Sequence, residues 1–438
     1  MFNKSFWKYF ISTIKESKWL LIKYIIVGLY LIITGIIANR LNLNDLTYYN
    51  AMMTVLFLGE MIAFGFSEGF GIYINQNINE PEKSKNYAKI GFIFVSIYAI
   101  FITTIFAIFP KFILKNILNL EFDVSLTFYY LMVAVMFFNT IFSYYSNLLK
   151  KVGEFKIQTI NTIIQSVLIV AILIILLAAK KLFLVPIGIL FLISYIFCCI
   201  YSHIALLKNK TYKVNLFKLK NLKLTKQEFK IVTERTLSEV VWEIGYFFIS
   251  LFILKVDVIT YNQYCYFENV LDILNGVFFA FINVVAIKIC RCIGEEKQEE
   301  AYSHGINSLK STFVIWFIYA IISTALFVPL KLGMNEELQS TAFLSLILFL
   351  TISLFRFLEW NLGTYILGQS DHFAKLGLIL ETVFTCYWIT MFLIAELIPA
   401  NIFMIYSLIA AENITKTIIS FVVFKKKKWL KKADWFKL

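Results

Sequence analysis

The stretch Asn75–Lys89, NQNINEPEKSKNYAK, returns in altered form at Lys288–His304, KICRCIGEEKQEEAYSH. Tyr87 and Tyr302 occupy matching places in the two stretches, 215 positions apart. Both stretches are polar turns between long apolar segments, and their recurrence indicates a chain built from two similar halves.

A second pair of turns supports the repeat. The turn Lys150–Phe155 (KKVGEF) corresponds to Leu367–His372 (LGQSDH) in the second half, and Glu154 and Asp371 are separated by 217 positions. The apolar segments around these turns fall into two sets of six, so both halves enter the membrane in the same sense. This parallel-repeat plan is typical of several secondary transporters, and it favours transport over membrane-bound chemistry.

The composition points to an integral membrane protein. The 438 residues are 60% hydrophobic and 16% charged, with a mean hydropathy of +0.76. Segments of about 20 apolar residues cross about 30 Å of hydrocarbon as helices, and no period-2 alternation suggests a barrel. We predict an all-α integral membrane protein with twelve transmembrane helices in two six-helix lobes, centred near residues 29, 62, 99, 137, 169, 194, 243, 275, 318, 354, 385 and 412.

The predicted organisation has five parts. They are a cytoplasmic interfacial N-terminal segment (1–17), an N-terminal lobe (18–207), a basic cytoplasmic linker (208–230), a C-terminal lobe (231–424) and a basic cytoplasmic tail (425–438). The net charge of +13 comes largely from lysines before the first span, in the linker and in the tail. The positive-inside bias places these parts and both termini in the cytoplasm, and this distribution argues against a nucleic-acid partner.

The sequence offers no constellation for catalysis or for a cofactor. Six cysteines form no disulfide framework, and the three histidines stand in no cluster with metal-ligand spacing. There is no GxxxxGK[ST] phosphate loop and no nucleophile elbow. We therefore expect a protein that is not an enzyme and needs no cofactor or metal.

Ionisable residues inside the spans are the candidate functional groups, because an unpaired charge in hydrocarbon costs several kcal/mol. Neighbouring acids one helical turn apart share a face and can take up protons or hold Na⁺. The competing interpretation is structural, with Arg356 neutralising one or two acids and clamping spans seven, eight and ten together. The candidates are Glu239, Glu243, Glu268, Asp272, Arg356, Glu359 and Glu68.

Three acids, one of them the candidate Glu68, receive separate interpretations. Glu68 either lines a central cavity or satisfies a neighbouring helix. Glu412 and Lys416 form an i,i+4 pair of favourable polarity, so an internal salt bridge is expected. Glu396 lies near an external helix end, where we expect it to be hydrated.

At the repeated loops the sequence resembles the multidrug and toxic compound extrusion (MATE) family. The residues that carry the resemblance are IGEEKQEEAYSHGI (293–306), similar to the family's loop of a Gly, acidic residues and a following Ala, and LGQSDHF (367–373), similar to its Gly-x-x-Asp turn. The resemblance implies export of cationic or other amphipathic small molecules in exchange for Na⁺ or H⁺, by alternating access of two lobes. It also implies a monomer in the lipid bilayer of a bacterial inner (plasma) membrane.

The resemblance implies site residues as well. One branch of the family places a cation-binding Glu on span seven, which falls on Glu239 or Glu243, so these two are the candidates for Na⁺. The partner Asp on span ten does not carry over, since Arg356 stands near that position with Glu359 one turn later. The span-one segment YLIITGIIANRL (30–41) has no acid, unlike another branch. The coupling ion therefore stays open.

Two alternatives compete with this interpretation. A flippase for lipid-linked oligosaccharide belongs to a sister branch of the same superfamily and tends to line its cavity with cations, for which Arg356 and Lys23 argue. A membrane-bound acyl- or glycosyltransferase would need a catalytic constellation in a sizeable loop. The largest loop here is the lysine-rich linker, with one acid and no His.

Overall fold

The computed structural model describes residues 4–38, 41, 43–117, 125–180, 183–209, 212–218, 223–332, 339–370 and 373–430. Several predicted features lie partly outside these ranges, namely residues 1–3 of the N-terminal segment, residues 39 and 40 of the span-one segment, residues 210–211 and 219–222 of the linker, Asp371 and His372 of the Gly-x-x-Asp turn, and residues 431–438 of the tail. Asp272 lies on a described helix, but its side chain is outside the described part.

The described residues contain twelve long helices and no strand, which confirms the all-α prediction. Each long helix contains one of the predicted span centres. Ten helices are long and apolar enough to cross a membrane by length and composition, within the described residues. In chain order the long helices are α1 (Lys4–Ala38), α2 (Leu43–Gln76), α3 (Pro81–Ile108), α5 (Leu126–Lys151), α6 (Phe155–Ala178), α7 (Leu184–Lys208), α8 (Lys226–Val256), α9 (Val258–Gly294), α10 (Gln298–Ala325), α13 (Ala342–Glu359), α14 (Ala374–Leu393) and α15 (Ile402–Lys425).

Local sequence signals set several helix ends. Pro81 occupies the first turn of α3, where its missing N–H costs nothing. The Asp257 carboxylate accepts from the backbone N–H groups of Ile259 and Thr260 at the start of α9. Asn401 caps α15 in the same way. These polar caps satisfy backbone donors that would otherwise be unpaired at the helix ends.

The chain divides into two compact units. The N-terminal unit comprises Ile22–Thr236, and the C-terminal unit comprises Met1–Leu21 together with Leu237–Leu438. The division cuts α1 and α8, so it is a packing division and not the same as the repeat-based lobes. The limits of those lobes stay predictions.

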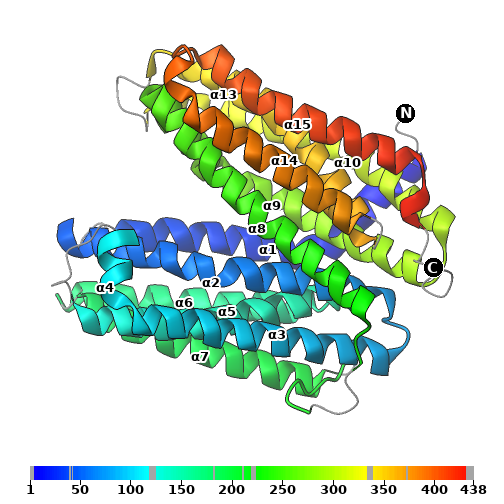
Figure 1. Cartoon of the computed structure of the whole chain (residues 1–438), viewed down its shortest axis with the longest axis horizontal. Coiled ribbons are helices and arrows are strands. Elements are labelled where there is room, and N and C mark those ends of the chain that lie inside the picture. Colours follow the sequence, from blue (N-terminus) through cyan, green and yellow to red (C-terminus); the bar gives the residue numbers. More distant parts are fainter. Residues whose placement is uncertain are drawn as a thin grey trace. The chain divides into compact units, whose positions relative to one another are not determined.

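In the N-terminal unit, α5 packs against both α2 and α7 (Figure 1). The Tyr129 hydroxyl donates to the Phe106 carbonyl at 2.8 Å, and the Tyr144 hydroxyl donates to the Ala88 carbonyl at 2.5 Å. These bonds tie α5 to α3 through buried polar groups, whose pairing is strongly favoured away from water.

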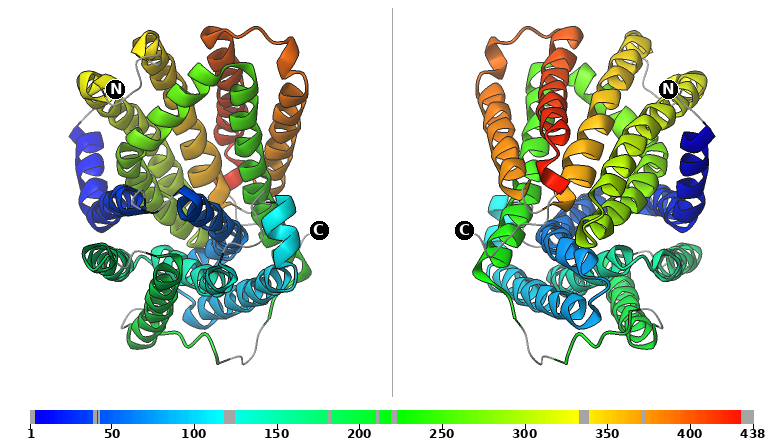
Figure 2. Two further views of the ribbon diagram at one scale, coloured as in Figure 1. Left: turned by 90° about the vertical axis from the view of Figure 1, so that its left-hand side faces the viewer. Right: turned by 90° about the vertical axis from the view of Figure 1, so that its right-hand side faces the viewer.

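In the C-terminal unit, aromatic packing holds the helices together. Phe278 on α9 stacks on Phe357 on α13 with ring centroids 4.2 Å apart. The start of α1 joins this unit, because Phe6 is buried and Phe10 packs against Phe281. Helices α14 (orange) and α15 (red) belong to the same helix bundle (Figure 2), and their side chains meet, since the Lys416 ammonium of α15 forms a salt bridge with the Glu381 carboxylate of α14.

Helix α2 approaches α8 closely at two glycines of the N-terminal unit. A Cβ atom added at Gly65 would lie 2.9 to 3.1 Å from atoms of Thr236, including its Cα and carbonyl oxygen. At Gly69 the same addition would meet the backbone of Val232 at 3.1 Å. Small residues thus permit the helix contact, as is usual in membrane helices.

Gly65→Ala is expected to lower the midpoint temperature of unfolding, because the added methyl group meets backbone atoms that cannot rotate away. Overpacking of this kind costs about 1–3 kcal/mol. Thermal unfolding of the purified protein in detergent measures the effect. Gly377→Ala on α14 is the matched control, since its Cβ would meet Phe373 and Ser238 only at 3.6 Å or more. Equal behaviour of the two variants would contradict the proposed contact.

Candidate functional site

Helix α8 carries the two acids predicted for span seven. Glu239 and Glu243 lie one turn apart and interact electrostatically as like charges. Both side chains are half-buried. Among the residues that the structure describes, Glu243 makes no ion pair. This pair is therefore a site where a proton or a small cation would relieve repulsion between two carboxylates.

The predicted arginine of span ten pairs with an acid of span eight. The Arg356 guanidinium on α13 forms a salt bridge with the Glu268 carboxylate on α9. It also donates to the Tyr264 hydroxyl at 2.8 Å, and it lies 5.7 Å from the centre of the Trp360 ring. Arg356 is thus surrounded by one carboxylate, one hydroxyl and one aromatic face, which compensate for its burial.

A second buried cation lies between α14 and α15. The Lys416 ammonium is 2.7 Å from carboxylate oxygens of both Glu381 and Glu412. The Trp388 indole N–H donates to the other oxygen of Glu412 at 2.5 Å. The expected Glu412–Lys416 salt bridge is confirmed, and Glu381 is an additional partner on a different helix.

Glu359 lies where α13 changes its winding. The α-helix ends at Glu359 and continues as a π-helix over Trp360–Ile366 and a 3-10 turn over Leu367–Gln369. Glu359 is buried, interacts electrostatically with Lys416 and Glu239, and packs over Gly363, where an added Cβ would lie 3.1 Å from its carboxylate. A π-helical segment inside a membrane helix is frequent at functional sites.

The intramembrane charges of the C-terminal unit are mostly negative. Six described carboxylates lie within the predicted spans of α8, α9, α13, α14 and α15, whereas the buried cations described on the parts of these helices that belong to this unit are Arg356 and Lys416. These carboxylates are Glu239, Glu243, Glu268, Glu359, Glu381 and Glu412. Asp272 adds a further acid to α9, with a side chain outside the described part.

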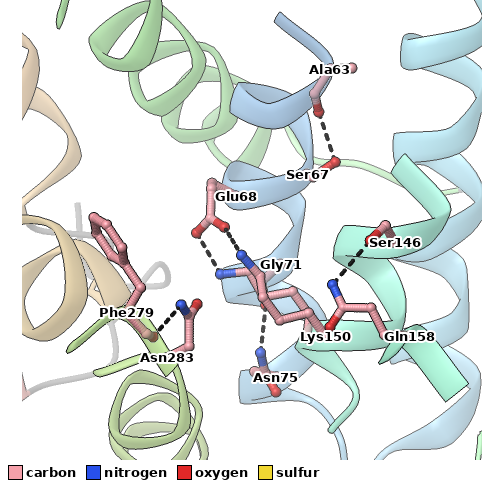
Figure 3. Close-up of polar contacts among 11 residues, drawn as sticks. Ala63, Ser67, Glu68, Gly71, Asn75, Ser146, Lys150, Gln158, Phe279 and Asn283 are labelled. Atoms are coloured by element: carbon pink, nitrogen blue, oxygen red, sulfur yellow. Dashed lines mark hydrogen bonds and ion pairs between the residues drawn. The ribbon is translucent and has the colours of Figure 1, made fainter. Parts of the chain in front are cut away.

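The N-terminal unit has a different charge cluster. Glu68 on α2 forms salt bridges with Lys150 at 3.2 Å and Lys151 at 2.5 Å, both on α5 (Figure 3). Arg235 also acts electrostatically on Glu68. All these side chains are buried, so Glu68 satisfies a neighbouring helix in this unit. Its role in a transport cavity stays a prediction.

Sequence reasoning did not identify three members of these networks. The sequence does not single out Glu381 as a partner of Lys416, and it places Lys150 and Lys151 in a polar turn. Their only sequence signal is position, since Lys150 and Lys151 end a span while Glu68 lies inside one. Pairing across helices depends on how the helices rotate against each other, which spacing along the chain does not encode.

The structure also brings together a group of potential metal ligands. Ligand atoms of Cys292 at the end of α9 and of Glu300 and His304 on α10 lie within 4.8 Å of one another. Cys292 is buried, whereas Glu300 is exposed. The sequence spacing did not indicate this grouping, because the cysteine and the i,i+4 pair come from different helices.

Known proteins share this fold. The family model MatE matches residues 20–176. A MATE structure in complex with MaL6 has a TM-score of 0.80 at 14% identity, covering 95% of this chain and 96% of that one. An outward-facing multidrug resistance MATE family transporter of the MOP superfamily has a TM-score of 0.81 at 14% identity, covering 96% of each chain. A MOP superfamily transporter from Pyrococcus furiosus, described as having a binding pocket of reverse polarity, has a TM-score of 0.80 at 14% identity and covers 96% of each chain. No curated protein sequence matches this chain.

The twelve long helices, ten of which are apolar enough to span a membrane within the described residues, and their buried charges define a multi-pass helical membrane protein whose fold is similar to that of the solved MATE structures. The resemblance to the MATE family is confirmed, since the fold agrees over nearly the whole chain and residues 20–176 match the family model.

Lys416→Met is expected to destabilise the protein strongly. The substitution leaves the buried carboxylates of Glu381 and Glu412 without their shared cation, and breaking a buried ion pair costs about 3–5 kcal/mol. Thermal unfolding in detergent gives the measurement. The triple variant Lys416→Met, Glu381→Gln, Glu412→Gln should recover part of the loss, because it removes the unpaired charges. If the single and triple variants unfold at the wild-type temperature, the network does not stabilise the fold.

Proposed function

We propose that this protein is a MATE-like secondary active transporter that exports organic cations or other amphipathic compounds in exchange for Na⁺ or H⁺. Its two lobes would alternate access to the two sides of a bacterial inner membrane, with both termini in the cytoplasm and one chain carrying the whole pathway. The observation that carries the proposal is the Glu239–Glu243 pair on α8, in which Glu243 makes no ion pair among the described residues.

The chemistry of this pair suits a coupling ion. Two carboxylates one turn apart in a membrane helix repel each other, and low dielectric strengthens that repulsion. A proton or Na⁺ bound at Glu239 or Glu243 removes one charge or bridges both. Departure of the ion restores the repulsion, so occupancy can bias one conformation of the transporter over another.

The remaining acids support a cationic substrate. Within the predicted spans of α8, α9, α13, α14 and α15, six described carboxylates stand against two buried cations of the C-terminal unit, Arg356 and Lys416, and the resulting negative potential attracts positively charged molecules. Aromatic side chains such as Tyr246 lie one turn from Glu243 on α8 and offer faces for organic cations.

Arg356 fits this proposal as a positioning residue. Its charge is taken up by Glu268 and its N–H groups bind the Tyr264 hydroxyl. The structural interpretation has Arg356 clamp α8, α9 and α13 together, and the observed pairing joins two of these helices, α9 and α13. A neutralised guanidinium repels an incoming cation less than a bare one would.

The alternative is a flippase for lipid-linked oligosaccharide, and one observation favours it. Buried cations outnumber buried acids in the described part of the N-terminal unit, where Lys150, Lys151 and Arg235 act on Glu68. Lys23 adds a further cation, which acts electrostatically on Glu60. Such an excess of positive charge suits a pyrophosphate group better than an organic cation.

Glu243→Gln is expected to abolish gradient-driven transport, because the amide can neither release a proton nor hold Na⁺ as a carboxylate does. Liposomes that contain the protein would be loaded with a fluorescent organic cation. Efflux of this dye would then be followed under an imposed Na⁺ or H⁺ gradient. Glu239→Gln should give the same loss or shift the ion dependence. If the glutamine variants lose dye efflux under only one of the two gradients, the ion of that gradient is the coupling ion.

Glu299→Gln is the matched control for this assay, because Glu299 is exposed at the start of α10 and lies away from the α8 pair in sequence. It should transport at the wild-type rate. If neither gradient moves the dye and both glutamine variants behave as wild type, cation export fails. Movement of a fluorescent pyrophosphate-linked lipid between the leaflets of the same liposomes would then support the flippase.

A further inference from the structure

The N-terminal unit contains a basic pocket between the first turns of α3 and the linker that precedes α8. Its volume is about 1110 Å³, which is ample for an organic molecule, since ligand pockets usually measure about 300–1,000 Å³. Six lysines line it, three from each wall. They are Lys83, Lys85 and Lys89 on α3, and Lys213, Lys218 and Lys223 on the linker.

Hydrogen bonds fix the two walls of this pocket to each other. The Asn86 side chain donates to the Lys223 carbonyl at 2.7 Å and accepts from the Lys223 backbone N–H at 3.4 Å. The Ser84 and Tyr212 hydroxyls are 3.0 Å apart and share a hydrogen bond, with both groups buried. The two backbone walls that carry the lysines are therefore held in a fixed arrangement around a preformed space, into which the exposed side chains of the linker lysines can reach.

The two acids of the pocket are already engaged. The Glu228 carboxylate accepts from the Thr225 backbone N–H at 2.8 Å, and the Thr225 hydroxyl accepts from the Glu228 backbone N–H at 3.2 Å, which together form a capping box at the start of α8. The Glu228 carboxylate also accepts from the Tyr87 hydroxyl at 2.5 Å. Glu82 forms a salt bridge with Lys85 at 3.6 Å. Neither acid is paired with the lysines of the linker wall.

Four of the lining lysines have no ion pair among the described residues. They are Lys89 on one wall and Lys213, Lys218 and Lys223 on the other. Four like charges around one space repel one another, so the pocket is electrostatically incomplete without an anion. Lysine ammonium groups bind phosphate oxygens as strong point-charge donors.

We propose that this pocket binds a phosphorylated anion that contacts lysines of both walls. The pocket has room for two phosphate groups, or for one phosphate with an organic part. The anion neutralises the lysines of α3 and of the linker together, and so ties the linker to α3. The phosphate belongs either to an anionic lipid headgroup or to a soluble compound.

The test uses the full-length protein in nanodiscs of phosphatidylcholine, a lipid without net charge. Pyrophosphate is the soluble probe, and nanodiscs that contain phosphatidylglycerol supply the lipid headgroup. Trypsin cleaves after lysine, so the rate of cleavage after Lys213, Lys218 and Lys223, mapped by mass spectrometry, reports occupancy directly. We expect at least one probe to slow this cleavage several-fold at constant ionic strength. Protection by pyrophosphate indicates a soluble ligand, and protection by phosphatidylglycerol alone indicates a lipid headgroup.

Variants separate the pocket from general attraction to positive charge. Lys85→Gln, Lys89→Gln and Lys213→Gln together should weaken binding of the protective probe by about tenfold or more, because charge-assisted contacts are lost. The control carries Lys4→Gln, Lys8→Gln and Lys15→Gln, three exposed lysines of α1 that lose the same charge outside the pocket.

The control should bind as the wild type does. Thermal unfolding of both variants checks that each is folded. The protection experiment on the wild-type protein does not depend on the folding of any variant. The proposal is overturned if neither probe protects the linker of the wild-type protein. It is also overturned if the pocket variant and the α1 variant lose affinity equally.

Discussion

The charges placed inside its apolar helices are the physical constraint on which this protein depends. Each such charge requires a partner, because hydrocarbon offers neither water nor counterions. Lys416 meets the requirement through two carboxylates, Arg356 through Glu268 and Tyr264, and Glu68 through two lysines. Each network joins at least two helices of one unit. The same groups that are expensive to bury therefore fix how those helices are rotated against each other.

Glu243 is different because the charge acting on it has the same sign. A buried pair that is fully satisfied, such as Lys416 with its two glutamates, loses stability when a proton or ion is added. A repelling pair gains stability from the same event. Coupling to an ion gradient thus suits Glu239 and Glu243, whereas the paired residues suit the scaffold that holds them. Glu359 combines both kinds of interaction, because the Lys416 ammonium attracts its carboxylate and the Glu239 carboxylate repels it.

The sequence predicted the helices well because spanning helices leave a long, continuous apolar signal. All twelve predicted centres fall within long helices. It also predicted the Glu412–Lys416 pair, because residues four apart on a helix are neighbours whatever the tertiary structure. It could not select Glu268 as the partner of Arg356, because that contact depends on the register between α9 and α13. The π-helix over Trp360–Ile366 was also not predictable, since no proline or glycine pattern announces such a change of winding.

The predicted repeat pairs helices of the two halves but does not pair their charges. The position 215 residues after Glu68 is Asn283, whose side chain donates to the carbonyl one turn back, at Phe279. In the other direction, the positions 215 residues before Glu381 and Lys416 are Ser166 and Tyr201. Apolar span length is preserved between the halves because every span meets the same bilayer, whereas each buried charge needs its own partner.

A charge can therefore be gained or lost only together with its network. The bilayer thickness sets the length of the spans in both halves. The need of each buried charge for a partner gives each half its own electrostatic character. In the C-terminal unit that character is negative, with two buried cations among six described carboxylates. In the N-terminal unit, Lys150, Lys151 and Arg235 gather around the single acid Glu68. Under the predicted repeat, one arrangement of helices thus carries two halves of different electrostatic character.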